Sequence, residues 1–349
     1  MSKSDNIKLS LLGLPVMATI EDFSKLTHIS VRSIYHLTKY SSRHYFTYDI
    51  PKKSGGLRTI SQPSKRLKGL QSWVLFNILN NLKVSNSCKG FEKGTSVIDN
   101  VVPHINSTTI LSLDLKDFFS SIKSVKIFNI FRAIGYNDEI STILTNLCTV
   151  DNGLPQGGPC SPKLANLSAW PLDVRIQGFV GKRGITYTRY ADDLTFSANN
   201  PNKVVKIIAY ITSIVEQENL KINPNKTRIA GISRQKKVTG LVISEEKFGI
   251  GRQKYKELRR KIHYLTKPNE QLNLKRINEV QGWLSYLYGV DKRRYFEAVK
   301  YIVRLKSKKP DTLLNKISYP IKKASEVKDA VELIIPTEII EINIIPPTL

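Results

Sequence analysis

Cysteine is scarce in this sequence, and residues that bind soft metals are widely spaced. Three cysteines and five histidines are spread over 349 residues, with no CxxC pair and no HExxH-type pair. A small, odd number of cysteines argues against a disulfide framework, and the spacing argues against a zinc site built on thiolates. The pattern fits a reducing compartment, and we expect the protein to be cytoplasmic.

Long apolar runs and acidic residues are also in short supply. No apolar run approaches the ~20 residues that a membrane-spanning helix needs, and residues 1–8 lack the apolar segment of a signal peptide. Both absences exclude a secreted or membrane-spanning protein. The 29 Asp and Glu face 54 Lys and Arg, which gives a net charge of +25. Such an excess indicates a polyanionic partner, either nucleic acid or an anionic membrane surface.

The charge is unevenly distributed along the chain. Residues 1–310 contain 50 basic and 23 acidic residues, whereas residues 311–349 contain four Lys and six Asp or Glu. From Val331 onward the tail is acidic, β-branched and interrupted by proline. We expect a strand there, which either closes its own domain or adds to the sheet edge of a partner.

Apolar periodicity and turn residues predict helices that alternate with hairpins. The expected helices cover residues 19–40, 65–83, 123–150, 162–170, 203–219 and 252–306. The expected strands are a buried one over 108–114 and hairpins over 44–62, 185–198 and 236–251. Residues 24–37 resemble a helix-turn-helix, but an ordinary helical pair that packs on the core is the favoured interpretation. Pro171 predicts a kink or an early helix end near Trp170.

Three carboxylates stand where strands are expected to end. Asp114 closes an apolar run, and Asp192 and Asp193 fall at the turn of the hairpin 185–198. Adjacent acids at a tight turn repel each other unless a cation lies between them, and a hard cation such as Mg²⁺ suits oxygen ligands. Three carboxylates around two metal ions are the apparatus of in-line phosphoryl transfer. The alternative is a solvated turn together with an acid that caps a helix.

A glycine-rich loop lies between these acids in the sequence, over residues 153–162. Gly157 and Gly158 permit close approach of the backbone to a ligand. Gln156 offers a donor and acceptors beside them, and Ser161-Pro162 is typical of a helix start. A simple connector ahead of the helix is the alternative.

Together these motifs resemble the reverse transcriptases. Their order is Asp114, five residues before Phe119, then Leu154-Pro-Gln-Gly157, then Tyr190-Ala-Asp-Asp193. Within that family the chain resembles the retron enzymes, which carry an NAxxH element and a VTG element. Asn100-Val-Val-Pro-His104 departs from the first at Val101, and Val238-Thr-Gly240 matches the second. The resemblance extends from about residue 10 to residue 306.

The resemblance implies roles for individual residues. Asp114 and Asp192 would bind two Mg²⁺ ions, with Asp193 completing the acidic cluster. Phe119 would stack under the incoming sugar and reject a ribose 2′-OH, and Gln156 would line the nucleotide pocket. Lys52 and Arg58 would grip the triphosphate, although Lys53 could replace Lys52.

The resemblance also implies a surface for RNA. The hairpin 236–251 would position the primer end, and basic residues on the helices beyond it would follow a phosphate backbone. Tyrosines interleaved with them could stack on bases or sugars. The residues expected to contact RNA are His104, Val238, Thr239, Gly240, Arg252, Lys256, Arg259 and Arg260. His104 could instead help at the primer hydroxyl or serve as a structural histidine, and the structural role is favoured.

The fold implied by the resemblance is an α+β right-hand polymerase. Its palm would be an RRM-like antiparallel sheet, with fingers, a helical thumb and a short C-terminal extension. We expect an N-terminal helical segment over residues 1–45 and fingers and palm over 46–240. The primer-grip hairpin and thumb would cover 241–306, and the extension 307–349.

The function implied by the resemblance is RNA-directed DNA synthesis from dNTPs in a bacterial cytoplasm. Retron enzymes copy their own structured non-coding RNA from the 2′-OH of a guanosine within it. The product is a branched RNA–DNA, the msDNA, which stays bound. Retrons resemble antiphage defence systems that restrain an effector, so an effector protein is an expected partner. The alternatives are a reverse transcriptase of another lineage, such as a group II intron protein, and a non-enzymatic nucleic-acid-binding repressor or scaffold.

Overall fold

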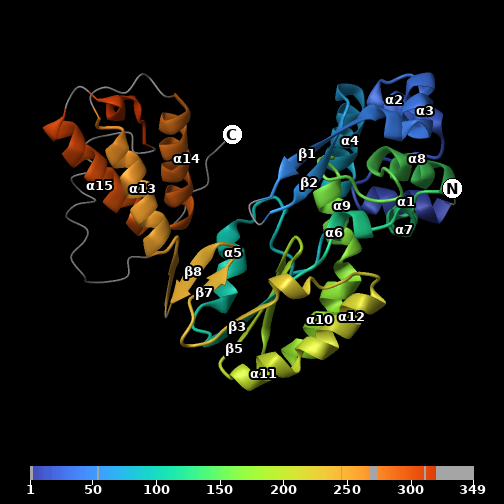
Figure 1. Cartoon of the computed structure of the whole chain (residues 1–349). Helices are drawn as coiled ribbons and strands as arrows, with labels where there is room; N and C mark the ends of the chain where they lie inside the picture. The colour runs from blue at the N-terminus through green and yellow to red at the C-terminus, as the bar shows by residue number, and fades with distance from the viewer. Residues whose placement is uncertain (1–2, 53–54, 245, 268–273, 310–311, 320–349) are drawn as a thin grey trace. The chain divides into compact units, whose positions relative to one another are not determined.

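The chain forms two units, residues 1–247 and residues 248–349, which are described separately. The computed structural model describes residues 3–52, 55–244, 246–267, 274–309 and 312–319 (Figure 1). Helices within these ranges are all too short or too polar to cross a membrane. The strand expected beyond Val331 lies outside the described residues.

The first unit begins with short helices that pack on its core. They are α1 (Lys3–Leu11), α2 (Ile20–Thr27) and α3 (Val31–Lys39). Thr19 and Asp22 form a capping box at the start of α2, and the Ser30 hydroxyl accepts a hydrogen bond from the Ser33 N–H at the start of α3. Phe23 and Ile34 are fully buried in the main hydrophobic cluster. The segment that resembles a helix-turn-helix is therefore a core-packing helical pair, as favoured from the sequence.

A two-stranded hairpin follows. After the 3₁₀ turn Ser41–His44, β1 (Tyr45–Pro51) pairs antiparallel with β2 (Leu57–Pro63), with Ile50 opposite Arg58. The hairpin expected over 44–62 is thus present.

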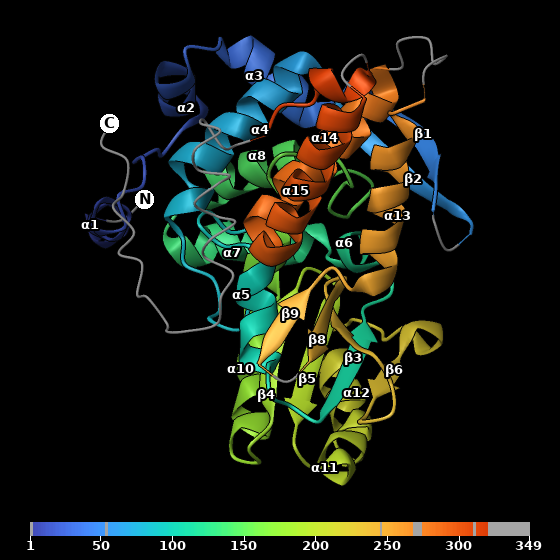
Figure 2. The same cartoon turned by 90° about the vertical axis from the view of Figure 1, so that its left-hand side faces the viewer.

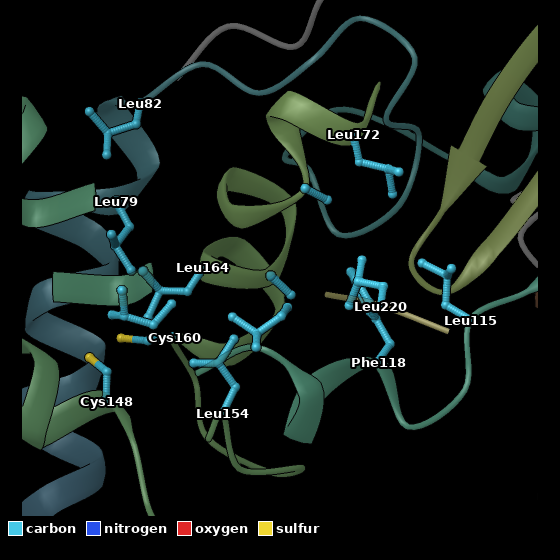
Figure 3. Close-up of a cluster of buried hydrophobic side chains, with 14 of the residues drawn as sticks. Leu79, Leu82, Leu115, Phe118, Cys148, Leu154, Cys160, Leu164, Leu172 and Leu220 are labelled. Atoms are coloured by element: carbon cyan, nitrogen blue, oxygen red, sulfur yellow. The ribbon is translucent and has the colours of Figure 1, made fainter. Parts of the chain in front are cut away.

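A helical layer fills the rest of the first half of the unit. It contains α4 (Lys65–Asn77), α7 (Ser124–Ile134), α8 (Asp138–Cys148) and α9 (Ser161–Ser168), with the short elements η2 (Leu79–Asn81), α5 (Val97–Val101), η3 (Val102–His104) and α6 (Phe118–Ser121). The helix expected over 65–83 ends earlier, at Asn77. Side chains from these helices and from neighbouring loops, such as Leu79, Leu164 and Phe118, form one buried cluster (Figure 3).

A four-stranded antiparallel sheet carries the second half of the unit. Its order is β4 (Thr186–Tyr190), β5 (Asp193–Ala198), β3 (Thr109–Asp114) and β6 (Arg228–Ala230). The helices α10 (Trp170–Gly181), α11 (Pro201–Lys206) and α12 (Ile208–Gln217) pack beside it (Figure 2). The 3₁₀ turn η4 (Pro224–Lys226) leads into β6. The mixed α and antiparallel β architecture expected from the sequence is confirmed.

Pro171 separates α9 from α10. It has no N–H to continue the helix and stands in the first turn of α10, directly after the break at Ala169. The interruption predicted near Trp170 is therefore present, and a new helix begins there. Asp173 lies in the first turn of that helix.

Small strands and three long helices follow in the part of the chain that the structure describes. The sheet order is β7 (Lys236–Val238), β8 (Leu241–Ser244) and β9 (Lys247–Gly249), and the boundary between the units falls within β9. The second unit packs α13 (Arg252–Tyr264), α14 (Leu274–Val290) and α15 (Lys292–Lys308) side by side (Figure 1). The 3₁₀ turn η5 (Leu313–Lys316) contacts α14 and α15, with Leu314 buried.

Candidate active site

The strand register brings the three predicted acids together. Asp114 is the last residue of β3 and lies directly opposite Asp193, the first residue of β5. Facing residues of an antiparallel pair have Cβ atoms about 4.5–5.5 Å apart. Asp192 occupies the turn between β4 and β5, and its carbonyl accepts a hydrogen bond from the Leu115 N–H at 2.9 Å. The turn is therefore tied to the end of β3.

The acids are only partly neutralised by the protein. Burial raises the pKa of Asp192, and the charge of Asp114 adds to the rise. Burial also raises the pKa of Asp193 to about 6, with further contributions from Asp192 and Asp114. Burial and mutual repulsion thus both oppose ionisation of these carboxylates. A multivalent cation bound between them would remove the repulsion and favour the ionised forms.

Lys226 is a cation that the sequence did not single out. Its Nζ lies 2.9 Å from Oδ2 of Asp114, and this hydrogen bond raises the pKa of Lys226. Asn223 donates to the other oxygen of Asp114 at 3.4 Å. Among the described residues, no three Asp, Glu, His or Cys side chains are gathered closely enough to hold a metal as they stand. The oxygen donors fit Mg²⁺, but Asp114 would have to exchange Lys226 for it.

A cleft of about 600 Å³ opens beside the acids. Asp114 and Asp193 line it, together with Lys226, Arg228 and the turn Thr239–Gly240. The structure thus places Thr239 and Gly240 of the VTG element and two of the three predicted acids on the walls of one cleft. The Thr239 backbone has a φ of +43°, and its buried hydroxyl has no hydrogen-bond partner within the described ranges. Val238 is buried, so its side chain is not placed to contact RNA.

The glycine-rich loop packs against the first hairpin. The Ser61 N–H donates to the Gln156 carbonyl at 2.8 Å. Gly157 has a φ of +131°, and a Cβ there would lie 2.9 Å from the Ser61 carbonyl oxygen. Only glycine fits this position without displacing β2. The glycine-rich loop and the hairpin therefore form one continuous surface, and the hairpin carries Lys52 and Arg58. Lys53, the alternative to Lys52, lies outside the described residues.

Arg58 acts electrostatically on the acids. Its positive charge lowers the pKa of Asp192, although burial, the larger effect, raises it. A basic side chain on the hairpin whose charge reaches Asp192 suits the grip on a triphosphate that was predicted for Arg58.

Phe119 belongs to an aromatic group that sequence reasoning only partly identified. Its ring centroid lies 6.4 Å from that of Phe91, and Phe91 lies 6.1 Å from Tyr190 of the Tyr-Ala-Asp-Asp motif. Phe91 stands in a loop with a φ of +60° and is 47% exposed. An isolated aromatic residue in a loop carries no periodic signal, so the sequence alone did not mark it.

His104 lies away from any surface on which RNA could bind. Its side chain is fully buried, and its two ring nitrogens lie 2.7 Å from the hydroxyls of Ser197 and Thr188. Burial lowers the pKa of His104 to about 4, so the ring is neutral at physiological pH. Its expected contact with RNA is corrected on these grounds, and the geometry fits the structural role.

The second unit concentrates positive charge. Residues 248–309 contain 17 Lys and Arg against five Asp and Glu, whereas residues 1–247 contain 33 against 18. Of the residues predicted to contact RNA, Arg252, Lys256, Arg259 and Arg260 are all exposed on α13.

Two hollows on this unit hold basic and aromatic side chains. One, of about 390 Å³ between α13 and α15, is lined by Arg259, Arg294, Lys300 and Arg304 with Tyr255, Tyr301 and one acid, Glu297, which pairs with Arg294. Another, of about 340 Å³ between α13 and α14, includes Arg260, Arg276 and Tyr264. Guanidinium groups lie over the rings of Tyr255, Tyr264 and Tyr301 at 4.2–4.4 Å. These rings already hold cations, so the hollows suit phosphate better than stacked bases.

The antiparallel sheet carries two acids at a hairpin turn and a third at the end of the neighbouring strand. Together with the glycine-rich loop and the basic helical unit, these features define a template-directed nucleic acid polymerase. The family model described as "Reverse transcriptase (RNA-dependent DNA polymerase)" matches residues 50–266. The Retron Ec86 reverse transcriptase of Escherichia coli is 48% identical over 316 residues, which cover 89% of this chain and 97% of that protein. The Retron Mx65 reverse transcriptase of Myxococcus xanthus is 33% identical over 281 residues, 74% of this chain and 66% of that protein.

Solved structures align with this chain less closely than these relatives. Telomerase from Candida albicans, in complex with a fragment of telomeric RNA, aligns with a TM-score of 0.44 and 11% identity, over 83% of this chain and 63% of that one. The match to the family model and the similarity to the retron enzymes establish the family of this chain. This chain belongs to the reverse transcriptase family, among the retron reverse transcriptases, and is an RNA-directed DNA polymerase that depends on divalent metal ions.

Proposed function

We propose that the chain reverse transcribes its own structured non-coding RNA from the 2′-OH of a guanosine within that RNA. The product would be a branched RNA–DNA that stays bound. The observation that carries this proposal is the cleft beside the acids, because Asp114 and Asp193 share its walls with the turn Thr239–Gly240. An RNA held by that turn would present a hydroxyl next to the catalytic carboxylates.

The proposed roles of the acids follow from their placement. Asp114 and Asp192 would hold two Mg²⁺ ions, and Asp193 would add negative charge from the facing strand position. The bound ions would lower the pKa of the attacking hydroxyl and neutralise the charge that develops on the phosphates. Lys226 would leave Asp114 as the ions bind and would remain nearby as a positive charge.

The nucleotide would lie against the surface that the hairpin β1–β2 and the glycine-rich loop form together. Arg58 and Lys52 would bind the triphosphate, and Gln156 would contact the nucleotide from the loop that packs on β2. Phe119, supported by Phe91, would occupy the space that a ribose 2′-OH needs, so that dNTPs are selected.

The helical unit would hold the RNA by its backbone. Its hollows present guanidinium groups whose planes are fixed over tyrosine rings, which suits phosphate contacts. A-form RNA is recognised mainly by shape and backbone. We therefore expect few base-specific contacts from α13 and α15.

The test is the nucleic acid that copurifies with the protein. The gene would be expressed with its flanking DNA, and the deproteinised complex would be digested separately with RNase and DNase. A discrete DNA whose mobility shifts after RNase treatment is expected. Heterogeneous RNA with no attached DNA would contradict priming on its own RNA.

Two variants test whether DNA synthesis depends on the proposed catalytic acids. Asp192→Ala should yield no DNA while its affinity for the RNA stays within about threefold of the parent, since the charge lost is one of many. Asp138→Ala removes an acid whose side chain is 80% exposed on α8 and should leave the product unchanged. Normal DNA yield from Asp192→Ala would remove the two-metal assignment.

A role in antiphage defence through an effector protein is the second part of the proposal. Its support is the acidic, apolar composition of the tail, most of which lies outside the described residues. Because Leu314 and Ile317 are buried against the helical unit, a truncation after Tyr319 is cleaner than removal of the whole tail. We expect it to preserve DNA synthesis and to abolish phage protection. Unchanged protection would argue against the tail as the effector site.

A further inference from the structure

We propose that Arg189 is a positioning residue for DNA synthesis. Its buried guanidinium holds the peptide of Ala191 and thereby sets the direction in which Asp192 leaves the hairpin turn. The inference rests on the role proposed above for Asp192. No sequence motif marked Arg189, and its side chain is completely shielded from solvent.

The guanidinium is fixed on two sides. Its Nε and Nη2 donate to the two carboxylate oxygens of Asp173 at 2.8 Å each. A bidentate pair of this kind fixes the plane of the guanidinium as well as its position. Asp173 is itself fully buried in the first turn of α10 and also accepts from the Tyr187 hydroxyl at 2.8 Å.

The remaining nitrogen reaches the catalytic turn. Nη1 donates to the Ala191 carbonyl at 3.2 Å and to Oδ1 of Asn166 at 3.1 Å. Ala191 has a φ of +58°, a strained conformation for a non-glycine residue, which persists only when the surroundings impose it. Arg189 and the Leu115 N–H thus hold the two successive carbonyls of the turn, those of Ala191 and Asp192.

The same hydrogen-bond network also fixes the loop 87–90, which packs against the turn. The Arg189 backbone exchanges hydrogen bonds with Ser87 and Lys89 at 2.7 Å each, and Asn166 donates to the Gly90 carbonyl at 2.7 Å. A Cβ on Gly90 would lie 3.0 Å from the Ala191 nitrogen. The loop 87–90 therefore packs directly beneath Ala191, and Asn166 links it to the guanidinium.

A buried ion pair is a costly way to achieve stability alone. Replacing such a pair with apolar residues of similar volume is often neutral or stabilising, whereas removing one partner is strongly destabilising. An apolar replacement cannot, however, supply the donor to the Ala191 carbonyl. The two roles therefore separate in a variant that removes both charges together.

The decisive variant is Asp173→Leu/Tyr187→Phe/Arg189→Met, which also removes the hydroxyl that Asp173 would otherwise leave unpaired. It would be compared with Leu144→Ala, a cavity in the core of α8 that lowers stability without touching the hairpin. Extension of an annealed primer gives kcat, KM for dNTP and the Mg²⁺ concentration for half-maximal rate. Asp192→Asn, measured in parallel, tests the acid assignment separately.

We expect the folded triple variant to lose about 100-fold in kcat, because small misplacement of reacting groups has effects of this size. The KM for dNTP should change less than about threefold, and half-maximal rate should need about tenfold more Mg²⁺. Leu144→Ala should change neither quantity. A folded triple variant with normal kcat and Mg²⁺ dependence would overturn the proposal while leaving the acid assignment intact.

Arg189→Lys provides a second route. It keeps a positive charge opposite Asp173 but cannot reach both Asp173 and the Ala191 carbonyl with the same geometry. If the triple variant does not fold, the same loss in kcat and Mg²⁺ dependence is expected of Arg189→Lys. Normal kinetics in that variant, or failure of both variants to fold, would make the pair a folding determinant only. An active Asp192→Asn would instead remove the proposed function on which the inference rests.

Discussion

At the scale of single residues, the three acids proposed as catalytic carry negative charge that the protein alone does not neutralise. Asp114 has Lys226 as a partner, but the pKa of Asp192 and that of Asp193 are both raised. Function here opposes stability, because the acids must stay close to bind metal and yet repel each other without it.

Asp193→Asn should therefore stabilise the metal-free protein at pH 7.5. The pKa of Asp193 in the folded state is about 6, above its ordinary value of 3.8. The folded state thus holds the proton more tightly, and the destabilisation grows as pH rises from 3.8 to about 6 and is complete above it. Burial of the carboxyl group is the main cause of this pKa, but the residue as a whole keeps exposed surface. We therefore expect a gain on the order of 1 kcal/mol after solvent screening.

Thermal melts with EDTA at pH 7.5 and pH 5 measure this gain. It should shrink at pH 5, where much of Asp193 is already protonated, and saturating Mg²⁺ should reverse its sign. A variant that is less stable than the parent at pH 7.5 without metal would contradict the interpretation.

Phe119→Ala should weaken the selection of dNTPs over rNTPs. Removal of the ring opens the space next to the sugar, and a site that excludes a hydroxyl by packing discriminates by about 10–200-fold. We expect most of that ratio to be lost in competing kcat/KM measurements. Phe91→Ala, which removes only the ring that contacts Phe119, should cause a smaller loss of the same kind. Unchanged selectivity in Phe119→Ala would assign the selection to another residue.

Single functional residues could be predicted from the sequence where the motif that marks them lies within a few consecutive residues. Adjacent acids at a turn, and an acid that ends an apolar strand, are visible without a structure. Arg189 was invisible because a charged residue in a strand is ordinarily expected to face solvent. Its partner Asp173 lies 16 residues earlier on a helix, and no periodicity links the two.

At the scale of elements, close backbone packing holds the glycine-rich loop against the hairpin. Gly157→Ala should destabilise the protein by about 1–3 kcal/mol, because its φ of +131° and its Cβ position beside the Ser61 carbonyl both oppose a side chain. The displaced loop should also raise the KM for dNTP. Thermal melting and primer extension measure the two effects.

Gly178→Ala is the matched control for that substitution. Gly178 lies inside α10, and a Cβ there meets nothing within 4 Å. Alanine should therefore stabilise the helix by roughly 0.5–1 kcal/mol with unchanged kinetics. Equal effects of the two substitutions would show that the packing of the loop on β2 does not matter.

Elements with a local signal were predicted well, and their ends less so. The three hairpins and the helix break at Pro171 follow from the chemistry of turn residues and proline. The regions 65–83 and 203–219 were expected as single helices, whereas the chain ends α4 at Asn77 and divides the second region at Ile207. Neither site carries a proline or glycine that would have signalled the end.

At the scale of the whole molecule, the net charge of +25 is densest in the helical unit. Residues 248–309 carry an excess of 12 basic residues, from 17 basic and five acidic, within 62 positions. Composition alone predicted a polyanionic partner. The placement of the charge on three packed helices required the fold, because residues far apart in sequence, such as Arg259 and Arg304, line one hollow.

Charge neutralisation in that hollow should govern the salt dependence of RNA binding. Each phosphate contact contributes about −0.7 to −0.9 to the slope of log K against log salt concentration. Arg259→Gln/Arg304→Gln should therefore make the slope shallower by about 1.5 and weaken binding most at low salt.

Lys203→Gln/Lys206→Gln removes two exposed charges on α11 of the other unit and should leave the slope within about 0.5 of the parent. Filter binding of the RNA from 50 to 400 mM salt, with Asp192→Ala in all proteins to prevent synthesis, measures both slopes. Equal changes in the two pairs would mean that RNA responds to net charge alone, whereas a change confined to the Arg259 and Arg304 pair places phosphate between α13 and α15.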